Sequence, residues 1–297
     1  MTEVLRISTE VQQALHEGGP VVALETTLVA HGFPPGVGVE VGRAADAAVR
    51  FEGATAATVG VLDGQVVVGL DPGELERFGE AGAGARKAGP GDLAACVASG
   101  ELGATTVGGT LAAARLAGIR FMGTGGIGGV HRAFAERPDI SADLAQLART
   151  PALVVSSGIK SLLDVPATAE LLETLGVPVL GYRTDELPLF YSAGGGPPVS
   201  ARVDDADQAA RTAEAHWELG GAALLLARDP DDGVDVEPLI EEALAEAAAQ
   251  GIHGQPVTPF VLSYLHGRSD GRTLEVNREL IVANARLAAQ VAVAASG

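Results

Sequence analysis

The feature that most constrains the fold is an alternation between short, largely apolar runs and longer alanine-rich segments. The runs PVVAL, IRFM, ALVV, VPVL and AALLL have the composition of buried strands. Segments with helical length and periodicity follow or precede each of them. Continuous apolar strands joined by helices are typical of a parallel sheet that is covered on both faces. We therefore predict a layered α/β/α fold with a mixed, partly parallel sheet, formed as one domain over residues 1–297.

The mixed character of the sheet comes from one hairpin. Asp63-Gly64 joins two β-rich runs within ATAATVGVLDGQVVVGLD, and this dipeptide is a strong signal for a two-residue turn. The segment YSAGGGPPVSARVDD at 191–205 is expected to be a surface loop. Helices are expected over 38–53, 72–82, 89–100, 110–118, 140–150, 159–176, 205–221, 237–251 and 273–295.

Charge and composition exclude several classes of protein. The formal net charge of −18 argues against non-specific nucleic-acid binding, which needs a basic face. No stretch reaches the roughly 18 apolar residues of a membrane-spanning helix, and the amino-terminal segment lacks the apolar core of a signal peptide. The single cysteine, Cys96, permits no intrachain disulfide and is predicted to be a buried thiol. We expect a cytoplasmic protein that binds a small molecule and neither nucleic acid nor a membrane.

The stretch GTGGIGGVHR contains glycines with the spacing G-x-G-x-x-G at Gly123, Gly125 and Gly128. A dinucleotide-binding fingerprint would also need a helix directly after the loop and an acid at the end of the next strand. Here VHRAFAERPD is broken by Pro138, and the next apolar run ends in SSGIK without an acid. Two alternatives stay open: a tight turn that packing demands, and a loop whose N–H groups face an anion.

Two residues with chemical potential follow apolar strands. Glu25 ends the run PVVAL, and Lys160 follows ALVVSSG. In open α/β sheets, ligands bind at the carboxyl ends of the strands. A carboxyl group there is a candidate general acid or base, and a lysine amine is a candidate nucleophile.

The segment PDISADLAQL carries Asp139 and Asp143 on either side of Ser141. One interpretation is a helix cap, because Ser and Asp at this position accept hydrogen bonds from the first helical N–H groups. The other is a site for Mg²⁺ or Mn²⁺, which one carboxylate and several waters can hold, beside a phosphate at the helix N-terminus. The sequence leaves both open.

Taken together, these segments resemble the pseudouridine-5′-phosphate glycosidase family, which includes proteins related to the indigoidine-synthesis A protein. The resemblance covers nearly the whole chain. It rests on ALETTLVAHGFP, VRFEGATAATVGVLDG, ARKAGPGDL, GATTVGGTLAAARLAGI, TGGIGGVHR, DISADLAQLA, SSGIKSLLD, GVPVLGYRTDELPLFY, TPFVL and NARLAAQVAVA.

The resemblance implies an enzyme that reversibly cleaves the C–C glycosidic bond of pseudouridine 5′-phosphate to give uracil and ribose 5-phosphate, in pseudouridine catabolism. It makes Lys160 the nucleophile that bonds to the ribose and Glu25 the proton donor. It makes Asp139 the ligand of one Mn²⁺ per subunit, with Mg²⁺ or another divalent cation as alternatives, and it implies a homotrimer. The substrate contacts that it implies are Lys87, Val107, His131, Ser141, Ala142, Asp143 and Asn284.

Two other functions are alternatives to this one. The first is an accessory role in a pigment pathway, which the same fold would serve and which the sequence does not distinguish. The second is a non-catalytic nucleotide sensor. A sensor needs neither a nucleophile nor a proton donor, so Lys160 and Glu25 argue against it.

Overall fold

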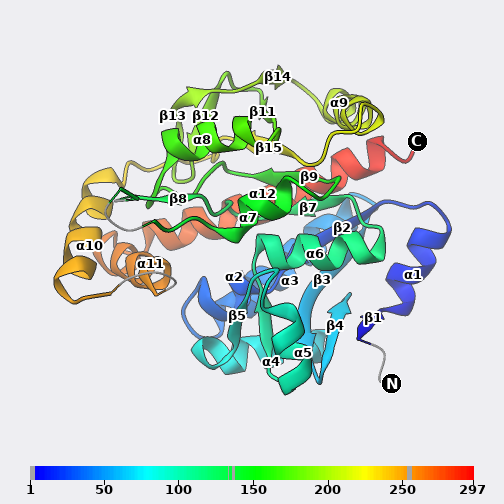
Figure 1. The fold of residues 1–297 in the computed structure, drawn as a ribbon, viewed down its shortest axis with the longest axis horizontal. Helices are drawn as coiled ribbons and strands as arrows, with labels where there is room; N and C mark the ends of the chain where they lie inside the picture. The colour runs from blue at the N-terminus through cyan, green and yellow to red at the C-terminus, as the bar shows by residue number, and fades with distance from the viewer. Residues whose placement is uncertain (1–3, 133, 136–137, 253–255) are drawn as a thin grey trace.

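The computed structural model describes residues 4–132, 134–135, 138–252 and 256–297. Within them, one eleven-stranded sheet uses strands from β1 near the N-terminus to β15 in the last third of the chain (Figure 1). Nine strands form its main path, in the order β1 (Leu5–Ile7), β4 (Gln65–Val68), β3 (Thr55–Leu62), β2 (Val21–Glu25), β7 (Phe121–Gly123), β9 (Leu153–Ser156), β15 (Leu224–Arg228), β11 (Val179–Tyr182) and β14 (Ala201–Val203). Off this path, β6 (Gly103–Thr105) pairs with β3 and β5 (Arg86–Ala88) pairs with β6.

The sheet is mostly parallel. All neighbours from β3 across to β14 on the main path are parallel, so their carboxyl ends meet at one edge. The antiparallel pairs are β3 with β4 and β3 with β6. The predicted hairpin is confirmed, because Leu62 pairs with Gln65 across Asp63 and Gly64, both at positive φ. The predicted mixed α/β fold is confirmed as well.

Helices cover both faces of the sheet. Figure 1 shows α6 and α7 in front of the central strands and α3 and α12 behind them. The long α12 approaches β7 closely, since a Cβ on Gly123 would lie 2.8 Å from the Ala285 backbone. The helices are α1 (Thr9–His16), α2 (Thr27–His31), α3 (Val37–Phe51), α4 (Pro72–Ala81), η1 (Gly82–Gly84), α5 (Leu93–Ser99), α6 (Val107–Ala117), α7 (Ala142–Leu147), α8 (Val165–Thr174), α9 (Ala206–Glu218), α10 (Glu237–Ala249), α11 (Val257–Arg268) and α12 (Arg272–Ala294).

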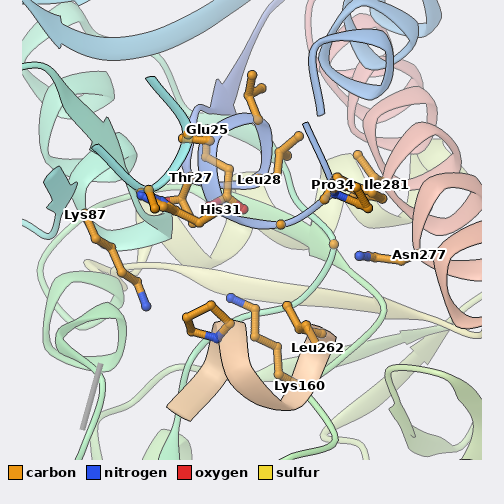
Figure 2. Close-up of a pocket in the computed structure, with 18 of the residues that line it drawn as sticks. Glu25, Thr27, Leu28, His31, Pro34, Lys87, Lys160, Leu262, Asn277 and Ile281 are labelled. Atoms are coloured by element: carbon orange, nitrogen blue, oxygen red, sulfur yellow. The ribbon is translucent and has the colours of Figure 1, made fainter. Parts of the chain in front are cut away.

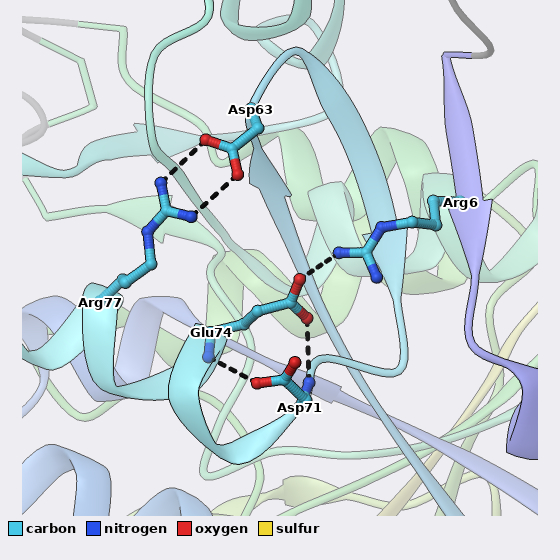
Figure 3. A network of polar contacts seen from close by, with 5 residues as sticks. All are labelled: Arg6, Asp63, Asp71, Glu74 and Arg77. Atoms are coloured by element: carbon cyan, nitrogen blue, oxygen red, sulfur yellow. Dashed lines mark hydrogen bonds and ion pairs between the residues drawn. The ribbon is translucent and has the colours of Figure 1, made fainter.

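Reciprocal caps explain why α4 starts where it does. The Asp71 carboxylate accepts from the Glu74 N–H at 2.8 Å, and the Glu74 carboxylate accepts from the Asp71 N–H at 3.0 Å. Glu74 also pairs with Arg6 of β1, while Arg77 makes a bidentate pair with Asp63 in the hairpin turn (Figure 3). The side chains of Glu74 and Arg77 therefore connect α4 to the first strand and to the hairpin turn.

Two expected elements differ from the structure. Residues 191–205 were expected to be a loop, but β13 (Ser192–Pro198) pairs with β12 (Glu186–Leu189), and β14 joins the main sheet. The helix expected over 159–176 starts only at Val165, because Asp164 caps it with Pro166 in the first turn. The residues before it form β10 (Leu163–Asp164), which pairs with β8 (Val130–His131).

The core is made largely of small and aliphatic side chains, many of them from the central strands, α3, α6 and α12. Cys96 is fully buried, as predicted. In the described part of the chain, no helix combines the length and apolarity that crossing a membrane requires.

Candidate active site

Three neighbouring parallel strands end at the same edge of the sheet and place polar side chains there. β2 ends at Glu25, β7 is followed by Thr124, and β9 is followed by Ser157 and then Lys160. Glu25 is 4% exposed, and its carboxylate accepts a hydrogen bond from the Thr124 hydroxyl. The topology thus brings Glu25 and Lys160 together although 135 positions separate them in sequence.

A cavity of about 720 Å³ opens at this edge. Glu25, Lys87 and Lys160 line it, and Figure 2 shows both lysine side chains extending into the same space. These are the only two lysines in the chain, since the other 18 of its 20 Lys and Arg residues are arginines. The two side-chain amines of this strongly acidic protein therefore lie in one cavity.

Burial controls the protonation of this charged cluster. It raises the pKa of Glu25, and the nearby Lys160 and the Thr124 hydrogen bond oppose that increase only in part. Burial and the charge of Lys160 lower the pKa of Lys87, against the attraction of Asp143, Glu25 and Asp139. A carboxyl group that stays protonated to a higher pH than usual is suited to donating its proton.

The glycine loop forms the wall that carries Lys160. The Ile127 N–H donates to the Gly158 carbonyl at 3.2 Å, and the Lys160 N–H donates to the Ile127 carbonyl at 3.3 Å. Gly125 and Gly126 of this loop line the cavity itself. The structure therefore favours the packing interpretation of GTGGIGG, with the loop as a support for the segment that contains Lys160.

The glycine loop does donate an N–H group to an anion, but this anion is a side chain of the protein, the Asp143 carboxylate. The Asp143 carboxylate, 4% exposed, accepts from the Gly108 N–H at 2.7 Å and the Gly128 N–H at 3.0 Å. The Thr106 hydroxyl donates to it at 3.2 Å. Asp143 thus joins the start of α6, the glycine loop and α7, where Ser141 is the cap that the sequence analysis proposed.

His131 and Asp139 lie beside one another, with 3.8 Å between Nε2 and a carboxylate oxygen. Burial lowers the pKa of His131, which Asp139 opposes and the charges of Lys87 and Lys160 reinforce. The Asp139 side chain is 34% exposed. Among the described residues there is no cluster of three or more His, Cys, Asp or Glu able to cage a metal. Asp139 would hold an ion such as Mg²⁺ or Mn²⁺ through its one carboxylate, with waters in other coordination positions.

The remaining predicted residues are not part of the described cavity wall. Val107 is the first residue of α6 and is buried. The fully buried Asn284 donates to the Thr124 carbonyl at 2.8 Å and the Gly125 carbonyl at 3.3 Å, so it holds the glycine loop in place. Of the predicted site residues, the described cavity wall includes Glu25, Lys87 and Lys160. It does not include Val107, His131, Asp139, Ser141, Ala142, Asp143 or Asn284, whose contacts with substrate stay predictions.

Thr124 and the apolar part of the cavity were not predicted from the sequence. Thr124 directly follows β7, so the strand-end rule that identified Glu25 also applies to it. No comparable signal marks the apolar wall. Phe190, Leu262 and Ile281 come from three distant segments that only the tertiary structure brings together.

Comparison with known proteins identifies the family of this chain. The family model described as Indigoidine synthase A like protein matches residues 10–294. A protein named pseudouridine-5′-phosphate glycosidase from Myxococcus xanthus is 47% identical over 296 residues, which covers 98% of each chain. One with the same name from Streptomyces griseus is 47% identical over 98% of this chain and 92% of its own.

Solved structures show the same fold. The crystal structure of the prealnumycin C-glycosynthase AlnA in complex with ribulose 5-phosphate superposes with a TM-score of 0.90 at 43% identity, covering 100% of this chain and 98% of that one. An indigoidine synthase A (IdgA)-like protein from Thermotoga maritima gives 0.89 at 36% identity over 100% and 99% of the two chains. The chain therefore belongs to the family of indigoidine synthase A like proteins, alongside the pseudouridine-5′-phosphate glycosidases that it matches over almost its entire length.

Proposed function

We propose that this protein reversibly cleaves pseudouridine 5′-phosphate, with water, to uracil and ribose 5-phosphate. The observation that carries the proposal is that a buried carboxyl group, Glu25, and the amine of Lys160 line one cavity at the carboxyl ends of the sheet. Its relatives are named for this activity. The fold is also that of a C-glycosynthase solved with a sugar phosphate.

The bond to be broken explains why an amine is needed. It joins ribose C1′ to uracil C5, so protonation of a leaving oxygen or nitrogen cannot weaken it. The C1′–O4′ bond of the ribose ring breaks, its oxygen takes up a proton to become the 4′-hydroxyl, and the Lys160 amine forms a bond to C1′ in its place. Its nitrogen lone pair then forms a C1′=N double bond while the electrons of the C1′–C5 bond move onto the uracil ring. Water hydrolyses the resulting Schiff base to ribose 5-phosphate and free Lys160.

Glu25 supplies the proton that completes cleavage. Uracil leaves with an electron pair at C5, and a neutral carboxyl group protonates that carbon. In the synthetic direction the carboxylate removes the same proton. Burial raises the pKa of Glu25, which keeps the acid form available for the cleavage direction.

The phosphate group calls for positive charge in an acidic protein. Lys87 provides an amine at the cavity wall. Asp139 would hold Mn²⁺, or Mg²⁺ in its place, and such an ion offsets phosphate charge and orients the substrate when bound. We also propose a homotrimer. Light scattering is then expected to give a mass about three times the 29.9 kDa of one chain.

The direct test is release of uracil. The protein with Mn²⁺ and pseudouridine 5′-phosphate is expected to release uracil, measured by chromatography, and to form pseudouridine 5′-phosphate from uracil and ribose 5-phosphate. Lys160→Ala is expected to lose both reactions. If the unmodified protein with metal catalyses neither direction, the proposed function is wrong. If Lys160→Ala keeps full turnover, the covalent mechanism is wrong.

A further inference from the structure

Asn277 is a buried polar residue for which the mechanism above has no use. It lies within α12, is 5% exposed and lines the cavity. Figure 2 shows its amide directed from the helix into the cavity. Within the described part of the chain its side chain makes no hydrogen bond. Asn277 is not among the described residues with a fully buried, unpaired polar atom, so its amide reaches the open cavity, where a bound ligand can complete its hydrogen bonds.

The surroundings of Asn277 suit a flat ring. Ile281 lies one helical turn further along α12 and lines the same cavity. The Phe190 ring lies against the glycine loop, because a Cβ on Gly126 would approach it to 2.6 Å. Leu262 of α11 adds another apolar contact surface. Ligand sites of this kind hold apolar faces by shape and use few polar groups to fix orientation.

The position of Asn277 relative to the two lysines separates the ends of the cavity. In Figure 2, Lys87 and Asn277 lie on opposite sides of Lys160. If Lys160 bonds to C1′, the phosphate end of the substrate extends toward the cation Lys87. The base then extends toward the neutral, mostly apolar end that contains Asn277.

We propose that Asn277 binds the polar edge of the uracil ring and thereby selects the base. Its Oδ1 accepts a hydrogen bond from a ring N–H, and its Nδ2 donates to the adjacent ring carbonyl. The donor and acceptor of the Asn277 amide thus face the acceptor and donor of the ring. This assignment rests on the proposed function, because it takes uracil as the part of the substrate that binds at the apolar end of the cavity.

The synthetic direction tests the assignment, because there uracil and ribose 5-phosphate are separate substrates. The variants are Asn277→Leu, which keeps the volume, and Asn277→Asp, which keeps the shape and removes the donor. Arg278→Gln, at the exposed next position of α12, is the matched control. We expect both Asn277 variants to raise KM for uracil by about tenfold or more while KM for ribose 5-phosphate stays within about twofold. The control leaves both constants unchanged.

Two further readouts separate binding of the base from a structural role. Borohydride trapping of ribose 5-phosphate on the protein needs no uracil, so the Asn277 variants are expected to trap it as the wild type does. Wild-type protein is expected to prefer uracil over 1-methyluracil or 3-methyluracil, whichever blocks the N–H that Asn277 recognises. That preference is expected to shrink toward unity in Asn277→Leu.

The outcomes distinguish this inference from the function on which it rests. Normal trapping with an unchanged KM for uracil would overturn the role of Asn277 and leave the proposed function standing. Loss of the folded circular dichroism spectrum in both variants would assign Asn277 a structural role and also overturn it. Wild-type protein that neither traps ribose 5-phosphate nor turns over would overturn the proposed function, and the assignment of Asn277 with it.

Discussion

Residues 123–129 and residues 192–198 are both glycine-rich, yet their glycines serve different purposes. The first segment, GTGGIGG, is buried throughout, and none of its glycines has a positive φ. The second, SAGGGPP, is a partly exposed strand in which Gly194 and Gly195 have φ of +59° and +82°. In the first segment glycine is required because there is no room for a side chain, and in the second mainly because of the backbone conformation.

This difference explains which segment belongs to the site. The buried segment pairs with the backbone at Lys160, places Thr124 on Glu25 and donates to Asp143. The hairpin segment is a strand at the surface of the molecule, paired with β12. Glycine content alone therefore does not identify a functional segment, whereas the space around each glycine separates these two segments.

Of the substitutions in and beside the two glycine-rich segments, Gly128→Ala is expected to have the largest effect. Its new Cβ would lie 2.5 Å from the Ser141 Cβ and 2.8 Å from an Asp143 carboxylate oxygen, so the glycine loop or α7 must move. Overpacking of this kind costs about 1–3 kcal/mol, and a displacement of about 1 Å near reacting groups costs about 100-fold in rate. We expect that loss in kcat and a lower Tm. Gly91→Ala, where nothing lies near the new Cβ, is the control and is expected to match wild type. Full activity in Gly128→Ala would contradict the supporting role of the loop.

The next effect concerns pH and tests the contact between the buried segment and Glu25. In the proposed mechanism cleavage requires protonated Glu25, so its rate is expected to fall as pH rises through the pKa of Glu25, which burial holds above the ordinary value. The Thr124 hydrogen bond lowers that pKa, so Thr124→Val should move the alkaline limb of the rate profile to higher pH. A limb that stays in place or moves down would show that another group controls it.

A smaller effect is expected in the hairpin. Gly195→Ala places an L-residue at φ +82°, which costs about 1–2 kcal/mol, while its Cβ meets nothing closer than 3.4 Å. We expect a modest decrease in the free energy of unfolding, measured in urea, with turnover within about twofold of wild type. A large loss of turnover would place the hairpin in the catalytic machinery and remove the contrast between the two segments.

The smallest effect is expected at Tyr191, which directly precedes the hairpin strand. Its hydroxyl is fully buried and has no hydrogen-bond partner in the described residues. Tyr191→Phe removes that unsatisfied group and keeps the ring, so Tm is expected to stay the same or rise. A clear decrease in Tm would reveal a partner for the hydroxyl.

Local signals predicted most of the fold. Apolar runs located the central strands, and Asp63-Gly64 located the hairpin because its turn requires two positive φ values. The β12–β13 pair could not be predicted, because exposed strands that contain Gly and Pro have the composition of loops. The start of α8 was placed too early because the pairing of β10 with β8 is a long-range interaction.

The site was predictable to the extent that it follows the strand ends. Glu25 and Lys160 follow from that rule and from the family resemblance, and the structure places both in one cavity. Asp143 illustrates the limit, since nothing in DISADL indicates that its carboxylate accepts from Gly108 and Gly128, which are distant in sequence. The apolar end with Asn277 was not predictable for the same reason.

The most direct test of the covalent mechanism uses the chain's two lysines. The protein is incubated with ribose 5-phosphate, reduced with borohydride and digested, and the peptides are analysed by mass spectrometry. We expect the mass of the reduced sugar phosphate on the peptide with Lys160, none on the peptide with Lys87, and none in Lys160→Ala. Modification of Lys87 in place of Lys160, or equal labelling of both, would contradict this expectation.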